Sequence, residues 1–166
     1  MTPEVDILIE SDLWSRVAGL EGLAREAIAA TLSQTGLKIA PQAEVSILFC
    51  DDSRIRELNR EWRRLDKATN VLSFPAVTAR ELPRAPLLGD IAIAFETVER
   101  ESRDEAKTFE HHVSHMIVHG FLHLLGFDHE VVSEAEAMEE AERGALARIG
   151  VADPYAGADL AGESFR

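Results

Sequence analysis

Alternation of apolar and polar positions predicts four strands in the first part of the chain. The runs "VDILIE", "AEVSILFCDD", "NVLSFP" and "DIAIAF" are short and rich in β-branched or aromatic residues. Pro75 ends the third run, and Gly89 precedes the fourth after the proline-bearing segment "TARELPRAPLLG". We therefore expect these four runs to form strands.

Helical spacing of apolar residues predicts two helices between these strands. The first is expected from about Asp12 to Ser33, where apolar residues recur three or four positions apart. The second follows Asp51 or Asp52, either of which can cap its amino end. Its apolar positions are Ile55, Leu58, Trp62 and Leu65, so its arginines are expected to point outward.

The carboxy-terminal half of the chain is predicted to be mostly helical. From Glu96 the helical pattern continues almost to Gly150, with an interruption at Gly126 and the residues just after it. The last helix covers "VSEAEAMEEAERGALARIG", in which Ser133 and Glu136 have the spacing of a capping box.

This order of elements predicts an α+β fold with a single mixed sheet of about four strands covered by helices. A length of 166 residues, of which 46% are hydrophobic, fits one domain with a sizeable core. We expect residues 1–155 to form that domain and residues 156–166 to be a flexible tail.

Composition narrows the class of protein. The formal net charge of −13 argues against a general nucleic-acid binder, because affinity for phosphates depends on cations. The single cysteine, Cys50, cannot form an internal disulfide, which favours a reducing compartment. No signal peptide or run of about 20 apolar residues is present, so we expect a cytoplasmic protein with no membrane contact.

Positive charge is nevertheless concentrated in one segment. "RIRELNREWRRLDK", residues 54–67, holds six of the 17 Lys and Arg residues. Two interpretations remain open: a local patch that faces phosphates, or a solvated helix face balanced by Glu57, Glu61 and Asp66.

Three histidines in "HGFLHLLGFDH", residues 119–129, indicate a metal site. His119 and His123 are four residues apart and share one face of the predicted helix. Gly126 can adopt the left-handed conformation that ends a helix, so the chain can fold back and bring His129 to the pair. Three imidazoles with an open fourth position are typical of catalytic zinc. The spacing is that of the metzincin signature HExxHxxGxxH, so we expect a metzincin-like motif on a central helix with one Zn²⁺ per chain.

The chemistry around this motif differs from that of a zinc peptidase. Gly120 stands where those enzymes carry the glutamate that activates water. Of the hypotheses about function, a zinc peptidase therefore has the least support. His115 shares the helix stripe of the ligands and is either a group that orients them, a proton shuttle or a core residue. Asp128 either acts at the metal site or caps the turn after the helix, and we favour the capping role.

Four motifs together make the sequence resemble the YbeY family of bacterial endoribonucleases and rRNA maturation factors. They are "LNREWRRLDK", "TNVLSFP", "LLGDIAI" and "HGFLHLLGFDH", in the order of the family, and the similarity runs from about Val45 to "DPY" at 153–155. The resemblance implies that His119, His123 and His129 bind zinc and that His119, His123 and Arg63 serve catalysis. Asn70 stands where many members have Asp, so we assign it no catalytic role.

The resemblance also implies substrates and partners. These are single-stranded RNA and rRNA, with maturation of the 3′ end of 16S rRNA and ribosome quality control, and a contact with the ribosome, most naturally its small subunit. DNA is not expected as a substrate. A different class of function stays open: a ribosome-assembly protein whose metal is only structural. For either function, zinc occupancy should drop as the pH falls below the histidine pKa of about 6.5, because ligand imidazoles must be neutral.

Overall fold

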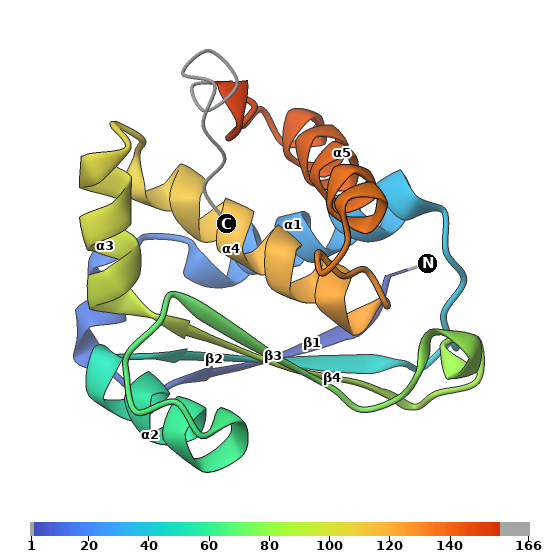
Figure 1. Cartoon of the computed structure of the whole chain (residues 1–166), viewed down its shortest axis with the longest axis horizontal. Helices are drawn as coiled ribbons and strands as arrows, with labels where there is room; N and C mark the ends of the chain where they lie inside the picture. The colour runs from blue at the N-terminus through green and yellow to red at the C-terminus, as the bar shows by residue number, and fades with distance from the viewer. Residues whose placement is uncertain (1, 157–166) are drawn as a thin grey trace.

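A four-stranded mixed sheet forms the middle layer of the molecule (Figure 1). The computed structural model describes residues 2–156. The strands are β1 (Glu4–Ile9), β2 (Glu44–Cys50), β3 (Val71–Pro75) and β4 (Leu87–Ala94), in the spatial order β1-β2-β4-β3. β1, β2 and β4 run parallel, and β3 pairs antiparallel with β4 at one edge. The predicted α+β class with one mixed sheet is confirmed.

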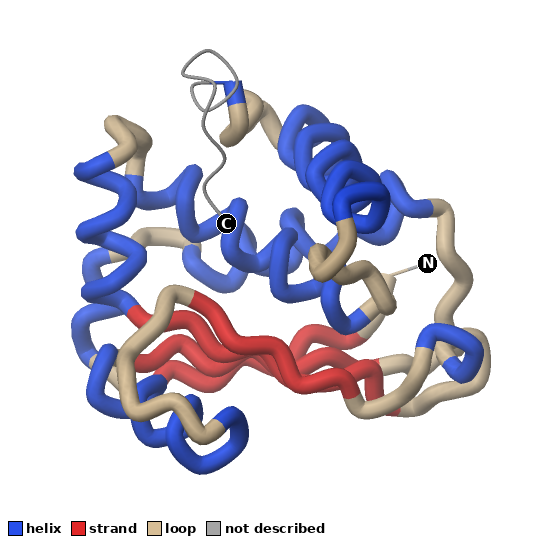
Figure 2. The backbone as a smooth tube through the Cα atoms, viewed as in Figure 1, coloured by secondary structure: helices blue, strands red, loops and turns tan. Residues whose placement is uncertain are grey.

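Helices cover the two faces of this sheet unequally (Figures 1 and 2). On one face lie α1 (Leu20–Thr35), α4 (Phe109–Leu124) and α5 (Val132–Arg148), with α3 (Phe95–Asp104) at one end. α4 contacts β3, β4, α1 and α5, which makes it the central helix. The opposite face carries α2 (Asp52–Arg63).

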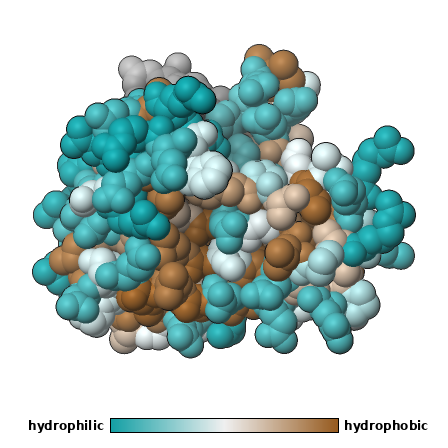
Figure 3. Space-filling view, turned by 90° about the horizontal axis from the view of Figure 1, so that it is seen from below, coloured by the Kyte–Doolittle hydropathy of each residue, from teal (hydrophilic) through white to brown (hydrophobic). Residues whose placement is uncertain are grey.

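The main core lies between the sheet and α1, α4 and α5. Alternate residues of β2 and β4, such as Ile47, Phe49, Ile91 and Ile93, pack there against apolar side chains of α4 and its neighbours. A smaller cluster under α2 contains Cys50, Ile55, Leu72, Ala92 and Ala94. Seen from below, apolar residues gather on part of the face that α2 occupies (Figure 3).

The predicted continuous helix from Asp12 to Ser33 is wrong. A short 3-10 helix, Asp12–Arg16, is followed by a break at Gly19, whose φ of +71° is left-handed, and α1 begins only at Leu20. The break lets Trp14 enter the core, where it is 1% exposed and its Nε1 donates a hydrogen bond to the Cys50 carbonyl over 2.8 Å. Long-range aromatic packing therefore overrides the local helical pattern.

Two further expectations about helices need correction. The helix predicted from Glu96 to Gly126 is interrupted between α3 and α4, where Ala106 has a φ of +55° and Thr108 caps α4. The capping box at Ser133 is absent, because the N-cap of α5 is Val131, two residues earlier. By contrast, Asp51 caps α2 as one of the two expected residues, since its side chain accepts a hydrogen bond from the Arg54 amide.

The apolar face predicted for the second helix is only half buried. Ile55 is fully buried, but Trp62 is 66% exposed and Leu65, beyond the end of α2 at Arg63, is 48% exposed. α2 contacts β4 and α3, whereas α1, α4 and α5 lie on the other face of the sheet (Figure 1).

Within the described part of the chain, every helix is too short or too polar to cross a bilayer. The tail expected at 156–166 lies outside the described residues, apart from Ala156.

Candidate metal centre

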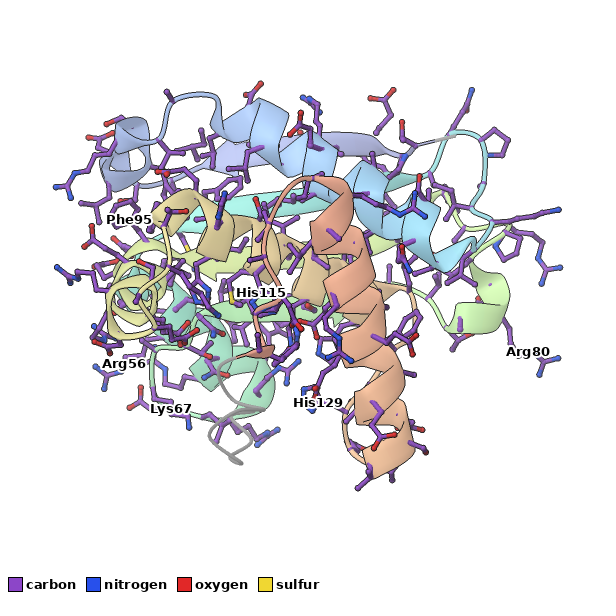
Figure 4. All side chains as sticks on the ribbon, turned by 90° about the horizontal axis from the view of Figure 1, so that it is seen from above. Arg56, Lys67, Arg80, Phe95, His115 and His129 are labelled. Atoms are coloured by element: carbon purple, nitrogen blue, oxygen red, sulfur yellow. The ribbon has the colours of Figure 1, made fainter. Side chains whose placement is uncertain are left out.

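Three imidazoles converge at the carboxy-terminal end of α4. His119 and His123 project from the last turns of the helix and His129 from the loop that follows; one ring nitrogen of each lies within 4.8 Å of the others. The Nε2 atoms of His119 and His123 are 3.2 Å apart. Figure 4 shows His115 and His129 beside α5.

The turn after α4 brings His129 back to the helix. Gly126 has a φ of +100°, and an added Cβ there would lie 2.9 Å from the Ala79 side chain. The Phe127 amide donates to the Leu122 carbonyl over 3.0 Å, a bond that reverses the chain at the helix end. The Asp128 carboxylate accepts from the His129 amide over 2.7 Å, so this side chain is used in the turn.

Hydrogen bonds fix the tautomers of the two helical histidines. Nδ1 of His123 donates to the Phe127 carbonyl over 3.0 Å, and Nδ1 of His119 faces a carboxylate oxygen of Glu142 at 3.4 Å. Both Nε2 atoms therefore carry lone pairs, and two lone pairs 3.2 Å apart repel each other unless a cation lies between them. Two nitrogens bound to one tetrahedral zinc ion stand about 3.3 Å apart. The donor set fits zinc.

The electrostatics of His123 favour the neutral form that binds a metal. Burial lowers the pKa of His123 to about 4, and the neighbouring charges of His119 and His129 act in the same direction. The ring therefore needs no deprotonation at neutral pH.

Glu142 of α5 is a buried carboxylate behind these rings. It is 1% exposed; one oxygen accepts from His115 Nε2 at 2.5 Å and from the Tyr155 hydroxyl at 2.9 Å. Burial alone would raise the pKa of Glu142, but hydrogen bonds from His115 and His119 outweigh burial and hold it below its usual range. A carboxylate behind a metal-binding histidine orients the ring and increases its basicity.

His115 belongs to this buried layer. It is 8% exposed, burial lowers its pKa, and its Nδ1 has no hydrogen-bond partner among residues 2–156. A neutral ring that donates Nε2–H to Glu142 satisfies all three observations. His115 could orient the ligands, shuttle protons or only fill the core. The geometry matches the first role, because the His115 ring holds the Glu142 carboxylate that faces His119.

Sequence reasoning missed Glu142 and Tyr155. Helical spacing could have identified Glu142, because its position falls on the face of α5 that is buried. The apolar residues on that face are Ala135, Met138, Ala145 and Leu146. A charged residue inside an apolar stripe indicates a buried partner. Tyr155 lies beyond the last helix, so no periodicity indicated its contact.

Gly120 faces the sheet. A Cβ at this position would stand 2.9 Å from Ile91 Cγ2, 3.2 Å from Ser73 Oγ and 3.3 Å from Val71 Cγ2. The position at which zinc peptidases carry their base is here a close helix-to-sheet contact.

Arg63 approaches the histidine helix from the other face of the sheet. Its Nη2 donates to the Ser73 carbonyl over 3.3 Å, and the Ser73 hydroxyl donates to the Gly120 carbonyl over 3.0 Å. Strand β3 thus joins the end of α2 to the turn of α4 that carries His119. Among the contacts of the described residues, Arg63 does not touch the three histidines directly.

Asn70 lies apart from this centre. Its Nδ2 donates to both carboxylate oxygens of Glu101, at 3.0 and 3.2 Å, and Glu101 also bonds His112 Nε2 at 2.9 Å. Glu101, Glu105 and His112 are close enough for a metal site, but Glu105 is paired with Lys107 at 2.8 Å. Both carboxylates and His112 Nε2 therefore have protein partners, whereas His112 Nδ1 has none among residues 2–156.

A family model described as "Endoribonuclease YbeY" matches residues 10–150. The chain belongs to the YbeY family. Relatives named "Endoribonuclease YbeY" include one from Methylocella silvestris, 51% identical over 93% of this chain and 87% of its own. Another from Nitrobacter winogradskyi is 53% identical over 93% of this chain and 83% of its own.

A solved structure shares the fold of this YbeY-family chain. The solution structure of TM1509 from Thermotoga maritima aligns with a TM-score of 0.56 and covers 96% of both chains at 24% identity. This likeness supports the arrangement of sheet and helices.

Proposed function

We propose that this protein is a zinc-dependent endoribonuclease that cleaves single-stranded RNA in rRNA maturation. Membership of the YbeY endoribonuclease family supports RNA cleavage. One observation carries the assignment of the site: three imidazole nitrogens within 4.8 Å, two of them with their lone pairs turned toward each other. His119, His123 and His129 would hold one zinc ion.

The residues around the proposed zinc ion have different roles in catalysis. Zinc, when bound, polarises a phosphoryl oxygen and lowers the pKa of coordinated water. Arg63 supplies a guanidinium that holds the scissile phosphate and stabilises its developing charge. Glu142 and His115 keep the His119 ring in place from behind. Since His115 Nε2 donates a hydrogen bond to Glu142, the ring is not placed to take a proton from an attacking oxygen.

The proposed setting is ribosome maturation in the cytoplasm. We infer rRNA as substrate, with the 3′ end of 16S rRNA as the processing site, a role in quality control of defective ribosomes, and a contact with the small subunit. Whether water or the 2′-hydroxyl of the RNA attacks is read from the product ends, because only the second leaves a cyclic phosphate.

Cleavage of a single-stranded RNA by the purified protein tests this function. His123→Ala and Arg63→Ala should each abolish most cleavage, whereas Arg56→Ala should retain it, because Arg56 is paired with Asp66 at 2.8 Å. Elemental analysis should find one zinc per chain in the wild type and none in His123→Ala. Cleavage that survives in both His123→Ala and Arg63→Ala would contradict the proposal.

A second candidate is a ribosome-assembly protein with a structural metal. It is favoured by one observation: ligation would fasten the loop that carries His129 to the end of α4. Under this reading a chelator lowers the melting temperature strongly and His123→Ala loses ribosome binding, while purified wild-type protein cleaves no RNA. Peptidase activity has no such support, because Gly120 packs against the sheet.

A further inference from the structure

Trp62 leaves most of its indole in solvent. It is 66% exposed, whereas Trp14 is 1% exposed. Phe74 of β3 supports the ring from one side in a T-shaped contact, with 6.5 Å between centroids and 63° between planes. The indole is therefore held at the carboxy-terminal end of α2 with a large part of its surface open.

Several basic residues close to Trp62 in the sequence form no ion pair. Arg54 is paired with Glu10 and Glu57, and Arg56 with Asp66. The remaining basic residues of the segment form no ion pair with any described residue: Arg60, Arg63, Arg64 and Lys67. A short segment with four basic residues outside any ion pair, in a chain of net charge −13, fits an anionic ligand.

The exposed ring lies next to the path from α2 to the histidines. Arg63, the residue after Trp62, donates to the Ser73 carbonyl, and Ser73 in turn donates to the carbonyl of Gly120, the neighbour of His119. Phe74, which supports Trp62, follows Ser73 in β3. A strand of RNA with one phosphate at the histidines and Arg63 would have to pass the edge strand β3 to reach this ring.

We propose that Trp62 stacks on a nucleobase of the single-stranded RNA substrate while Arg60, Arg64 and Lys67 hold phosphates that flank the scissile one. This inference rests on the proposed function and adds a base-binding subsite to it. A nucleotide combines a flat π surface with a phosphate, and an open indole among arginines matches both. The contact is tolerant of base identity, and it requires an unpaired base, because bases of a duplex are already stacked.

Fluorescence of the full-length protein tests the stacking. The titration uses the zinc-loaded protein and an unstructured single-stranded RNA oligonucleotide, whose integrity is checked on a denaturing gel after the last addition. RNA should quench the emission of Trp62, since Trp14 is buried. Affinity measured by anisotropy should fall about tenfold in Trp62→Ala and stay within about threefold in Trp62→Phe, which keeps an aromatic face.

Two controls separate stacking from other effects. Leu65→Ala removes another exposed apolar side chain, 48% exposed, and should leave affinity unchanged. A duplex of the same sequence should bind Trp62→Ala and wild type equally. Melting temperatures of the variants should match, because neither side chain is buried.

The outcomes discriminate between this inference and the function on which it rests. Wild-type cleavage of single-stranded RNA with unquenched Trp62 emission, or with equal affinity of Trp62→Ala, would overturn the stacking alone. Equal losses in Trp62→Ala and Leu65→Ala would assign the surface to a non-specific apolar contact and overturn it too. A wild type that neither binds nor cleaves RNA would overturn both.

Discussion

Substitution of Glu142 tests whether a buried carboxylate orients the metal-binding histidines. Glu142→Gln keeps the size of the side chain and removes the charge that faces His119 Nδ1 at 3.4 Å. We expect zinc affinity to fall by roughly 10- to 100-fold, measured by competition with a chromophoric chelator. Glu140→Gln, an exposed change on the same helix, is the control. Equal affinities in the two variants would show that Glu142 does not orient His119.

Cys50 is expected to be chemically inert in the folded protein. Burial raises the pKa of its thiol to about 12, and the adjacent Asp51 charge adds to this effect. Because the thiolate is the reactive form, an aromatic disulfide reagent at mildly alkaline pH should label Cys50 only after unfolding in guanidinium. Rapid labelling of the native protein would mean that β2 opens locally.

At the scale of elements, Gly120 sets how closely α4 packs on the sheet. Gly120→Ala places a Cβ 2.9 Å from Ile91 Cγ2, so we expect a loss of about 1–3 kcal/mol in the free energy of unfolding despite the better helix propensity of Ala. Gly22→Ala in α1 is the matched control, because no atom lies within 4 Å of the new Cβ. It should stabilise the protein by about 0.5–1 kcal/mol. Urea denaturation measures both, and a stable Gly120→Ala variant would contradict the tight contact.

Glu101 ties three elements together, since it bonds Asn70 before β3 and His112 of α4 from its place in α3. Burial alone would raise the pKa of Glu101, but the hydrogen bonds from His112 and Asn70 lower it overall. A lowered pKa means that this carboxylate stabilises the fold above its unfolded value of about 4.3 and loses that contribution as the pH falls through and below it.

Glu101→Gln should therefore lose roughly 1–2 kcal/mol of stability near neutral pH and little in acid. Denaturation at both pH values is the measurement. Glu99→Gln, which breaks only a surface pair with Arg103 at 3.9 Å, should change little at either pH. A deficit of Glu101→Gln that stays constant with pH would assign its effect to packing.

Elements with clear periodicity were predictable, and those shaped by distant contacts were not. The four strands and the fold class follow from local alternation, and the meeting of three imidazoles follows from a four-residue spacing and one glycine. The break at Gly19 depends on Trp14 finding a place among Phe49, Phe95 and Phe109 far along the chain. The exposure of Trp62 depends on which face of the sheet α1, α4 and α5 cover, and local spacing does not encode this.

At the scale of the whole molecule, a strongly negative chain must bind a negative substrate through one local surface. With four free cations near Trp62, RNA binding should involve at most about four phosphates. The logarithm of the affinity should then fall against the logarithm of salt concentration with a slope no steeper than about −3. Arg60→Ala should reduce the slope by about 0.7, whereas Arg25→Ala, in α1 and paired with Glu21 at 4.0 Å, should leave it unchanged. A slope that Arg60→Ala leaves unchanged would mean that the binding surface lies elsewhere, and a wild-type slope near zero would mean that binding does not depend on phosphate contacts.

The contact between Tyr155 and Glu142 has a consequence for the order in which the protein is completed. Synthesis proceeds from the amino end, so all four strands and the three histidines leave the ribosome before α5 and Tyr155 do. The carboxylate that steadies His119 arrives late, and its last donor arrives later still. A nascent chain therefore carries its three imidazoles before Glu142 and Tyr155 are available to orient them, and we expect tight zinc binding only after residue 155 has emerged.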